Sequence, residues 1–575
     1  MENVNVSLPN QQALLNAPKN QEKTVYVSRP GAVTQKKTPE EVKVEEREKM
    51  EQAAAWFRSI SLGSFLYAVI YAFCMYRNTE GITVPFCVGA TLYFFWYYAK
   101  KFCGTVRKCD VFLMVSVLLL GIITCTTDSD VIIWFNKIAV MVLVCIYLLE
   151  LFYDVNGWSF MAFVKAACYT VFGGIGQMVM PFTDGVAFYK SSKEKIGKMP
   201  MEESKKQKIS AIAIGIVIAL PMLLFIIMLL SSADLYFSDL FGRFFDAVFS
   251  YELPELFRQR VFGIVGTIVF MFLLSYGTIT YLTHKNSIRE VTEEKIKLWN
   301  SYIAITFTSL IAVVYVLFAA IQIFGLFMGA LELPEGYTYA SYARQGFFQL
   351  AFVCFFNICL VLICRACFEE HAVLKGMLLL LCACTYIMLL SSAYRMILYV
   401  KVYQLTFLRL FVLWALVVMA VVMAGIVIFI MKKSFPIFRV MLVSITAFYI
   451  GFAAAHPDYW IASYNIAQAK EGEEIDEFHL LFNLSLDAAV PILEYYEYDI
   501  ENPEVFYNEY FEEWELTLEC ERLKNYLNRI EQEAEDMTLR SFNISRAVAA
   551  LQIEKYMGDD LNSMELFAQK YNHRK

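Results

Sequence analysis

Histidine and the short catalytic motifs are both scarce in this chain. Only five of its 575 residues are histidines, and they are too scattered to form an H-E-x-x-H zinc site. The phosphate-binding pattern G-x-x-x-x-G-K-[ST] and the nucleophile elbow G-x-S-x-G are absent as well. The sequence therefore predicts no catalytic residue and no cofactor.

Cysteine is present but lacks the spacing that a metal site or a disulfide framework requires. Thirteen of the 14 cysteines lie in or beside apolar stretches, where a thiol behaves as a small hydrophobe, and only Cys520 comes after residue 455. Cys364 and Cys367 form a lone C-x-x-C before His371, without the second pair of ligands that a zinc site normally needs. We therefore predict neither a disulfide framework nor a bound metal.

Apolar sequence dominates the chain, in which 58% of the residues are hydrophobic and the mean hydropathy is +0.49. A helix needs about 20 apolar residues to cross the roughly 30 Å hydrocarbon core of a bilayer, and lipid favours helices because they satisfy their own backbone groups. These considerations predict an all-α, polytopic transmembrane helical bundle. The eleven candidate spans are 60–76, 83–99, 109–125, 132–153, 210–231, 261–282, 300–328, 346–368, 374–397, 405–431 and 437–455.

A further apolar segment, 157–181, makes a twelfth crossing conceivable. Lys165 lies within it, and a crossing there would move the lysine-rich loop 190–208 to the other side of the membrane. We interpret the segment as re-entrant or interfacial, with Gly173, Gly174 and Gly176 allowing a tight bend.

The distribution of Lys and Arg predicts the orientation of the bundle. Alternate loops between the spans carry 20 basic residues in one set and 8 in the other, and the richer set is expected to face the cytoplasm. This orientation explains the basic loops without a nucleic-acid partner. The expected location is the cell membrane, with the N-terminus in the cytoplasm and the C-terminus outside.

The two ends of the chain differ from the bundle, 59–455. Residues 1–58 are polar and have no early apolar core, so we expect a disordered or partly helical cytoplasmic tail and no cleaved signal peptide. Residues 456–575 contain 26 Asp and Glu against 10 Lys and Arg. Apolar residues nevertheless recur there at helical spacing, which predicts a small, acidic helical domain outside the membrane.

Within that C-terminal domain the pattern predicts three amphipathic stretches. In the first, 476–496, Phe478, Leu481, Leu484 and Ala488 are expected on one inward face, and Asp476 is expected to cap the helix. Two more helices are expected over 502–530 and 541–570. Their expected inward residues include Trp514, Leu516, Leu523 and Leu527.

Polar residues gather at the predicted outer ends of the spans. Tyr337 and Arg344 are seven residues apart and Arg395 and Tyr399 are four apart, so each pair can share a helix face. Such residues are typical interfacial anchors. They are also candidates for an outward-facing pocket in which arginines bind an anionic lipid or small molecule. The full candidate cluster is Asp234, Tyr337, Arg344, Arg395, Tyr399, Arg409, Asn465 and Asp487.

Several of these residues lie in stretches that resemble a bacterial membrane-protein family, domain of unknown function 4173, which is related to domain of unknown function 4153. The stretches are LLSSADLYF (229–237), YTYASYARQGFFQL (337–350), SAYRMILYVKVYQLTFLRL (392–410) and a part of 462–493. Leu235 and Gln404 depart from the family pattern, which indicates a divergent member. The resemblance covers roughly 210–495 and implies a membrane architecture without an established activity.

Because these stretches all map to outer helix ends, we expect one junction between the bundle and the C-terminal domain. Its predicted members are Asp234, Arg344, Arg395, Arg409, Asn465 and Asp487.

Three functions of different classes fit the sequence. The first is a non-enzymatic sensor or scaffold of the bacterial cell envelope, and the second is a transporter or flippase for an anionic small molecule or lipid. The third is a membrane enzyme resembling lipid-linked glycosyltransferases, for which Asp128 and Asp130 in an outer loop are candidate metal ligands. A polar cavity reaching mid-membrane favours transport, and a packed bundle without one favours the scaffold.

Overall fold

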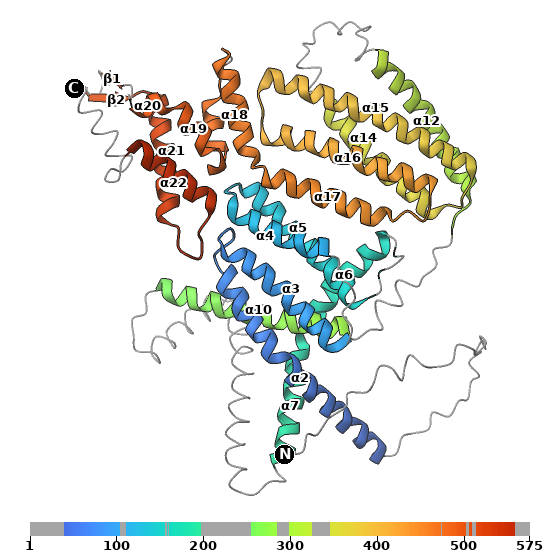
Figure 1. Cartoon of the computed structure of the whole chain (residues 1–575). Helices are drawn as coiled ribbons and strands as arrows, with labels where there is room; N and C mark the ends of the chain where they lie inside the picture. Colours follow the sequence, from blue (N-terminus) through green and yellow to red (C-terminus); the bar gives the residue numbers. More distant parts are fainter. Residues whose placement is uncertain are drawn as a thin grey trace, which may run out of the picture.

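Among the residues that the computed structural model describes, the chain is helical apart from two short antiparallel strands near the C-terminus (Figure 1). The structure describes residues 39–103, 111–153, 155, 158, 160–196, 255–283, 298–324, 346–472, 474–501, 505–508 and 513–557.

The helices form three groups along the chain. The N-terminal half of the bundle contains α2 (Pro39–Met75), α3 (Thr83–Cys103), α4 (Val111–Thr126), α5 (Asp130–Phe152), α6 (Phe160–Gly176), η1 (Gln177–Val179), α7 (Met180–Ile196) and α10 (Glu255–Thr283). The C-terminal half contains α12 (Ser301–Gln322), α14 (Phe347–Cys367), α15 (Ala372–Tyr403), α16 (Phe407–Met431) and α17 (Ile437–Ala454). The third group contains α18 (Pro457–Lys470), η3 (His479–Asn483), η4 (Leu486–Ala488), α19 (Ala489–Tyr495), α20 (Glu497–Glu501), β1 (Val505–Asn508), β2 (Glu513–Leu516), α21 (Leu518–Glu535) and α22 (Ile544–Met557).

Nine of the described helices are long and apolar enough to cross a membrane. Two further predicted spans, 83–99 and 109–125, are helical as α3 and α4, although α4 has only 16 residues. The predicted span 210–231 lies outside the described residues. The helical membrane architecture is thus confirmed, while the number of crossings stays a prediction.

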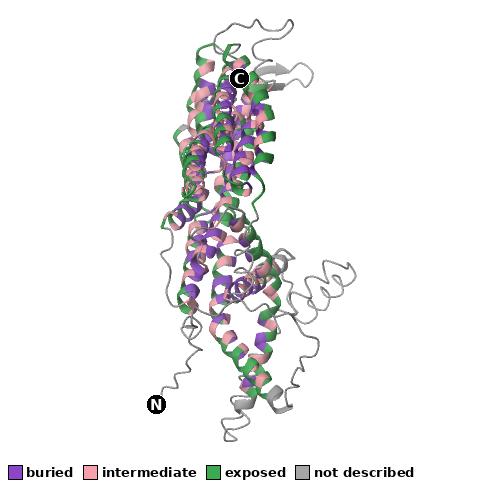
Figure 2. Cartoon of the chain, turned by 90° about the vertical axis from the view of Figure 1, so that its right-hand side faces the viewer, coloured by how far each residue is buried: buried purple, intermediate pink, exposed green. Residues whose placement is uncertain are grey.

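The outer faces of these helices carry large apolar side chains. Leu310, Val313 and Phe352, for example, are 69%, 70% and 69% exposed. Figure 2 shows exposed residues along the outer sides of the helices and buried residues between them. A soluble protein would rarely expose so much contiguous apolar surface, whereas a bilayer covers it.

From α2 to α5 and from α14 to α17, consecutive helices run in opposite directions, so their connections lie at two ends of the bundle, whereas α6, η1 and α7 follow one another without a reversal. The loops 76–82, 127–129 and 404–406 lie at the end that contacts the C-terminal helices, which we call the junction end. At the opposite or far end, the Trp299 N–H donates to the Cys367 carbonyl (2.8 Å). There the Tyr153 hydroxyl also donates to the Leu282 carbonyl (3.2 Å).

Two buried triads of the same composition join helices within the bundle. In the first, Tyr449 of α17 donates to Asn136 of α5 (2.7 Å), and Asn136 donates to Thr124 of α4 (3.1 Å). In the second, Tyr315 of α12 donates to Asn357 of α14 (2.9 Å), and Asn357 donates to Thr385 of α15 (3.0 Å). Each triad satisfies a buried amide that would be costly to leave unpaired in lipid.

Gly173 and Gly174 serve close helix packing, and none of the three glycines of 157–181 forms the expected tight bend. Residues 160–196 are helical throughout, with one 3-10 turn at η1. A Cβ added to Gly173 would lie 2.3 Å from the Tyr281 ring, and one added to Gly277 would lie 2.6 Å from the Gly174 carbonyl oxygen. Small residues let α6 and α10 approach closely, as is common between membrane helices.

The contacts of α6 and α7 lie toward the far end of the bundle. Phe163 stacks on Phe438 in the first turn of α17, and Phe188 of α7 packs 5.6 Å from Phe57 in α2. Length and composition alone qualify Ala162–Lys193 as a span. Whether the segment crosses the membrane or is re-entrant stays a prediction.

The C-terminal helices agree with the sequence analysis in part. Leu523 and Leu527 are buried in α21 as expected, and Asp476 accepts a hydrogen bond from the His479 N–H (2.9 Å) as an N-cap. Phe478, expected inside, is 56% exposed, because 479–483 form a π-helical turn that changes the periodicity. The expected helix over 502–530 begins only at Leu518. Before it, β1 and β2 pair antiparallel, so Trp514 and Leu516 lie in a strand.

The glycine contact between α6 and α10 gives a first prediction. Gly277→Ala should destabilise the protein by about 1–3 kcal/mol, because the new methyl group meets backbone atoms of Gly174 and Gln177. Gly176→Ala is the matched control, since nothing lies within 4 Å of its added Cβ, and it should be neutral or slightly stabilising. Thermal unfolding in detergent measures both. Equal effects of the two substitutions would contradict the packing role.

Candidate functional site

The structure describes five of the eight residues in the predicted outer cluster. They are Arg395, Tyr399, Arg409, Asn465 and Asp487, and all five lie toward the junction end. Asp234, Tyr337 and Arg344 lie outside the described residues. The expected proximity of Arg344 and Arg395 therefore stays a prediction.

Asp487 in η4 joins the C-terminal helices to the α4–α5 loop. Its Oδ2 accepts from the Thr127 hydroxyl (2.5 Å), and its Oδ1 accepts from the Asp128 backbone N–H (2.8 Å). The Nδ1 of His456, between α17 and α18, lies 3.1 Å from Oδ2. One buried carboxylate thus binds a loop of the N-terminal half and the turn after the last bundle helix.

Asp128 forms the reciprocal contact from the bundle. Its Oδ2 accepts from the Leu486 backbone N–H (3.0 Å), next to Asp487, and its Oδ1 accepts from Arg546 Nε (2.6 Å). Arg546 also lies 2.9 Å from Glu80 of the α2–α3 loop and 3.1 Å from Glu533 of α21. Arg546 is therefore the charged group that connects α22 with two bundle loops.

The start of α22 is positioned by Asn543. Its Oδ1 accepts from the N–H of Ser545 (2.9 Å), as an N-cap does, and its Nδ2 donates to the Thr127 carbonyl (2.8 Å). Beside it, the Ile82 N–H donates to the Phe542 carbonyl (2.9 Å). Asn543 thus caps α22 and binds the α4–α5 loop at the same time. This places Arg546, one turn further along α22, next to Asp128.

A second carboxylate, Asp458 in the first turn of α18, holds the segment that carries Asp487. Asp458 Oδ2 accepts from the Ser485 hydroxyl at 2.6 Å. His456 precedes α18 and adopts a left-handed backbone conformation with φ of 50°. This turn changes the chain direction between α17 and α18 and brings the imidazole to Asp487.

Burial and hydrogen bonding shift the pKa values of His456, Asp458 and Asp487, and the balance between the two differs from group to group. The hydrogen bond to Asp487 raises the pKa of His456. Burial acts to raise the pKa of Asp487, but hydrogen bonds from His456, Ser545 and Thr127 outweigh it, so this pKa is lowered. Burial raises the pKa of Asp458 despite its bonds from Ser485. The imidazolium and the Asp487 carboxylate thus stabilise one another.

Asn465 of α18 binds the loop between α15 and α16. Its Oδ1 accepts from the Leu405 N–H (2.8 Å) and its Nδ2 donates to the Leu405 carbonyl (2.9 Å). The neighbouring Gln404 donates to the Glu474 carbonyl. The C-terminal helices are therefore bound to the C-terminal half of the bundle as well as to its N-terminal half.

Arg409 completes the end of α15. Its guanidinium donates to the carbonyls of Tyr403 and Gln404, and it lies 4.4 Å from the centroid of the Tyr399 ring. A cation at the last carbonyls of a helix complements the helix dipole. In this arrangement Arg409 and Tyr399 stabilise a helix end.

Arg395 is buried one turn before Tyr399. Its Nη2 donates to Gln322 Oε1 (3.1 Å), which also accepts from the Ser391 hydroxyl (2.6 Å). Gly346, at the start of α14, has φ of 113°, and a Cβ there would lie 3.2 Å from Arg395 Nη1. The glycine of the YARQGFF stretch thus gives both the turn and the space for the guanidinium.

Sequence reasoning overlooked the residues that complete the junction. They are His456, Asp458, Asn543 and Arg546, together with Asp128, which was considered as a metal ligand. The N-cap pattern at Asn543 was a readable signal, but its partner Thr127 lies 416 residues away. Among the described residues, no group of three or more His, Cys, Asp or Glu is arranged to hold a metal.

Comparison with known proteins gives one match. The model of a family described as a domain of unknown function (DUF4153) matches residues 114–495. This is the second of the two related families that the sequence resembles, and membership of the first stays a prediction. The matched range includes Asp128, Asn465 and Asp487, whereas Asn543 and Arg546 follow it. No curated protein and no solved structure matches the chain.

The contacts of Arg546 give a second prediction. Arg546→Met should destabilise the docking of the C-terminal helices by about 2–3 kcal/mol, because it leaves three carboxylates, of which Asp128 is largely buried, without their cation. Proteolysis of residues 518–557 under native conditions measures this docking. Arg522→Met is the matched control, because Arg522 pairs with Glu477 inside the C-terminal group. This substitution should destabilise the docking by less than about 1 kcal/mol. Equal protease sensitivity of both variants would contradict the role of Arg546.

The pair of His456 and Asp487 gives a third prediction, a pH window for the junction. The raised pKa of His456 means that its contribution is complete below the usual 6.5 and is lost as the pH rises through the raised value. The lowered pKa of Asp487 means that its contribution is complete above 3.8 and is lost as the pH falls through the lowered value. The buried Asp458 acts in the opposite sense to Asp487, since its pKa is raised.

We therefore expect the free energy of protection of 540–546 from hydrogen exchange to fall by up to about 1 kcal/mol as the pH rises from 6.5 through the raised pKa of His456. His456→Asn tolerates the left-handed turn and does not titrate, so it should remove this pH dependence. If the His456→Asn variant kept the full pH dependence, the titrating group would be a different one.

Proposed function

The chain belongs to the DUF4153 family, and from this premise we propose that it is a non-enzymatic sensor or scaffold of the bacterial cell membrane. In this proposal the C-terminal helices respond to, or bind, something at the membrane surface. The junction passes the resulting change to the bundle. The apolar helices that are long enough to cross a bilayer support the membrane location.

The observation that carries the proposal is the connection of the C-terminal helices to both halves of the bundle. Asp487 and Arg546 bind the α2–α3 and α4–α5 loops, and Asn465 binds the α15–α16 loop. A displacement of α18 or α22 would break buried polar contacts in both halves at once. Such contacts have two discrete states, because a buried polar group is either hydrogen-bonded or carries the free-energy cost of having lost its partner.

The placement of basic residues supports the proposed orientation. Lys100, Lys101, Lys432 and Lys433 lie at the far end of the bundle, in the last turn of α3 and after α16. Cytoplasmic loops carry the excess of Lys and Arg, so the far end is proposed to face the cytoplasm. The junction and the acidic C-terminal helices then face outward, in the plasma membrane.

Transport and lipid-linked catalysis are less well supported by the described residues. Arg409, proposed for anion binding, donates to helix-end carbonyls, and Arg395 donates to Gln322. Asp128, proposed as a metal ligand for catalysis, accepts from Arg546 and Leu486. In this proposal, the outer cluster serves the sensor by binding an anionic lipid or small molecule at the outer face.

The test is complementation of a strain that lacks the gene, under stress by agents that act on the cell envelope. Wild-type protein should restore growth, and Arg546→Met at the same membrane level should not, while Arg522→Met should. A cysteine at Leu539, which is 95% exposed, should react with a membrane-impermeant maleimide in intact cells, and one at Lys433 only after permeabilisation. Full complementation by Arg546→Met, or substrate movement by the purified protein in liposomes, would overturn the proposal.

A further inference from the structure

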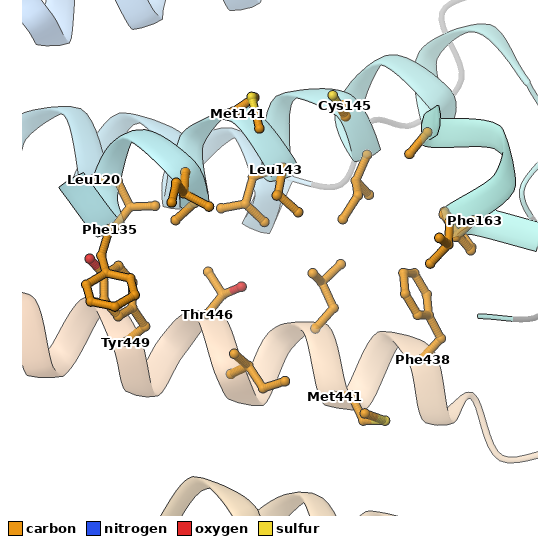
Figure 3. Close-up of a pocket in the computed structure, with 18 of the residues that line it drawn as sticks. Leu120, Phe135, Met141, Leu143, Cys145, Phe163, Phe438, Met441, Thr446 and Tyr449 are labelled. Atoms are coloured by element: carbon orange, nitrogen blue, oxygen red, sulfur yellow. The ribbon is translucent and has the colours of Figure 1, made fainter. Parts of the chain in front are cut away.

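A long apolar groove lies between the two halves of the bundle. It has a volume of about 640 Å³ and is bounded by α5 and α6 on one side and by α16 and α17 on the other (Figure 3). The Tyr449 hydroxyl, one of the few polar groups near it, donates to Asn136. The Thr446 hydroxyl also lines the groove, and the rest of the lining is almost entirely carbon and sulfur.

The groove lies at the depth of the membrane and opens sideways. The helices α5, α16 and α17 that bound it are all long and apolar enough to span a bilayer. Lining residues at its rim, Met141, Phe172 and Ile445, are 60%, 72% and 41% exposed. The lining has too few polar groups to hydrogen-bond the water that would fill the groove, and an empty groove would lose dispersion contacts. Hydrocarbon is therefore the occupant that fits.

The dimensions of the groove match one leaflet of a bilayer. Figure 3 shows it running along α17 from Tyr449 to Phe438, and Phe438 stacks on Phe163 with ring centroids 4.1 Å apart. Eleven residues of helix rise about 16 Å, roughly half of the 30 Å hydrocarbon core. A single acyl chain of the leaflet at the far end has that reach.

A basic residue stands where the headgroup of such a lipid would lie. Arg439 follows Phe438, its side chain is 57% exposed, and its Nη2 is 4.0 Å from Glu150 of α5, a distance at the limit of ion pairing. An exposed guanidinium at the far-end interface suits a phosphate, which it can bind through two N–H groups. The chemistry of the groove and that of its end thus fit the two parts of one phospholipid.

We propose that this groove is a binding site for one phospholipid, with an acyl chain between α5 and α17 and its phosphate at Arg439. The lipid completes the packing between the two halves of the bundle where side chains leave them apart. This site is separate from the junction and does not depend on the proposed function.

The test uses the full chain in nanodiscs of phosphatidylglycerol and phosphatidylcholine that contain a phospholipid with a photoreactive group in its acyl chain. After illumination, peptide mapping should place most adducts on 138–146 and 438–446. Thr446→Trp fills the groove and should lower those adducts at least about tenfold. Val313→Trp, on the exposed face of α12, is the matched control and should leave them unchanged.

Two further arms separate a bound lipid from other occupants. Ala167→Phe fills the groove from α6, so it repeats the test if Thr446→Trp does not fold. Arg439→Gln should lower the retention of phospholipid through detergent purification, measured by native mass spectrometry, without lowering labelling by a photoreactive fatty alcohol. Uniform labelling of α12 and α17, unchanged labelling in both filled variants, or chain-to-chain adducts in place of lipid adducts would overturn the proposal.

Discussion

The buried carboxylate of Asp487 is the group on which the arrangement of the C-terminal helices depends. It accepts from Thr127 and from the Asp128 backbone and pairs with His456, so it contacts the N-terminal half of the bundle and the turn after α17 together. A carboxylate removed from water is costly unless all its acceptor positions are used. Only the docked position of η4 against the α4–α5 loop meets that requirement, and docking is therefore specific in register as well as favourable.

The turns at the junction end carry backbone strain that the rest of the structure offsets. Arg77, Gln404 and His456, each between two consecutive helices, have positive φ angles of 49°, 65° and 50°. Such conformations cost on the order of 1 kcal/mol or more for a residue other than glycine. At Gln404 and His456 the same residue or its neighbour binds the C-terminal helices, through Glu474, Asn465 and Asp487. The turn at Gln404 thus presents the Leu405 backbone to Asn465 of α18, and the turn at His456 presents its imidazole to Asp487 of η4. The bonds made there compensate the strain.

The sequence was a good guide to this protein wherever a property is set by short-range periodicity. Apolar length predicted the helices of the bundle, and helical spacing predicted Leu523 and Leu527 inside α21. Periodicity failed over 502–516, where two short strands pair with each other, since a strand pairing is a contact between segments and not a property of either one. The resemblance pointed to Asn465 and Asp487, and both lie in the junction. Their partners were not readable, because Thr127 and Asp487 are separated by 360 residues and Asp128 and Arg546 by 418.

The contact between the two halves of the bundle changes in character along α17. Toward the junction end, Tyr449 of α17 donates to Asn136 of α5, which in turn donates to Thr124 of α4. Toward the far end, the same helix faces the apolar groove until Phe438 meets Phe163. Directional hydrogen bonds fix one end of the interface, while the other end is held by contacts that hydrocarbon can replace. The junction lies near the Tyr449 triad, through Thr127 next to the end of α4, so it stands at the end of the interface that directional hydrogen bonds fix.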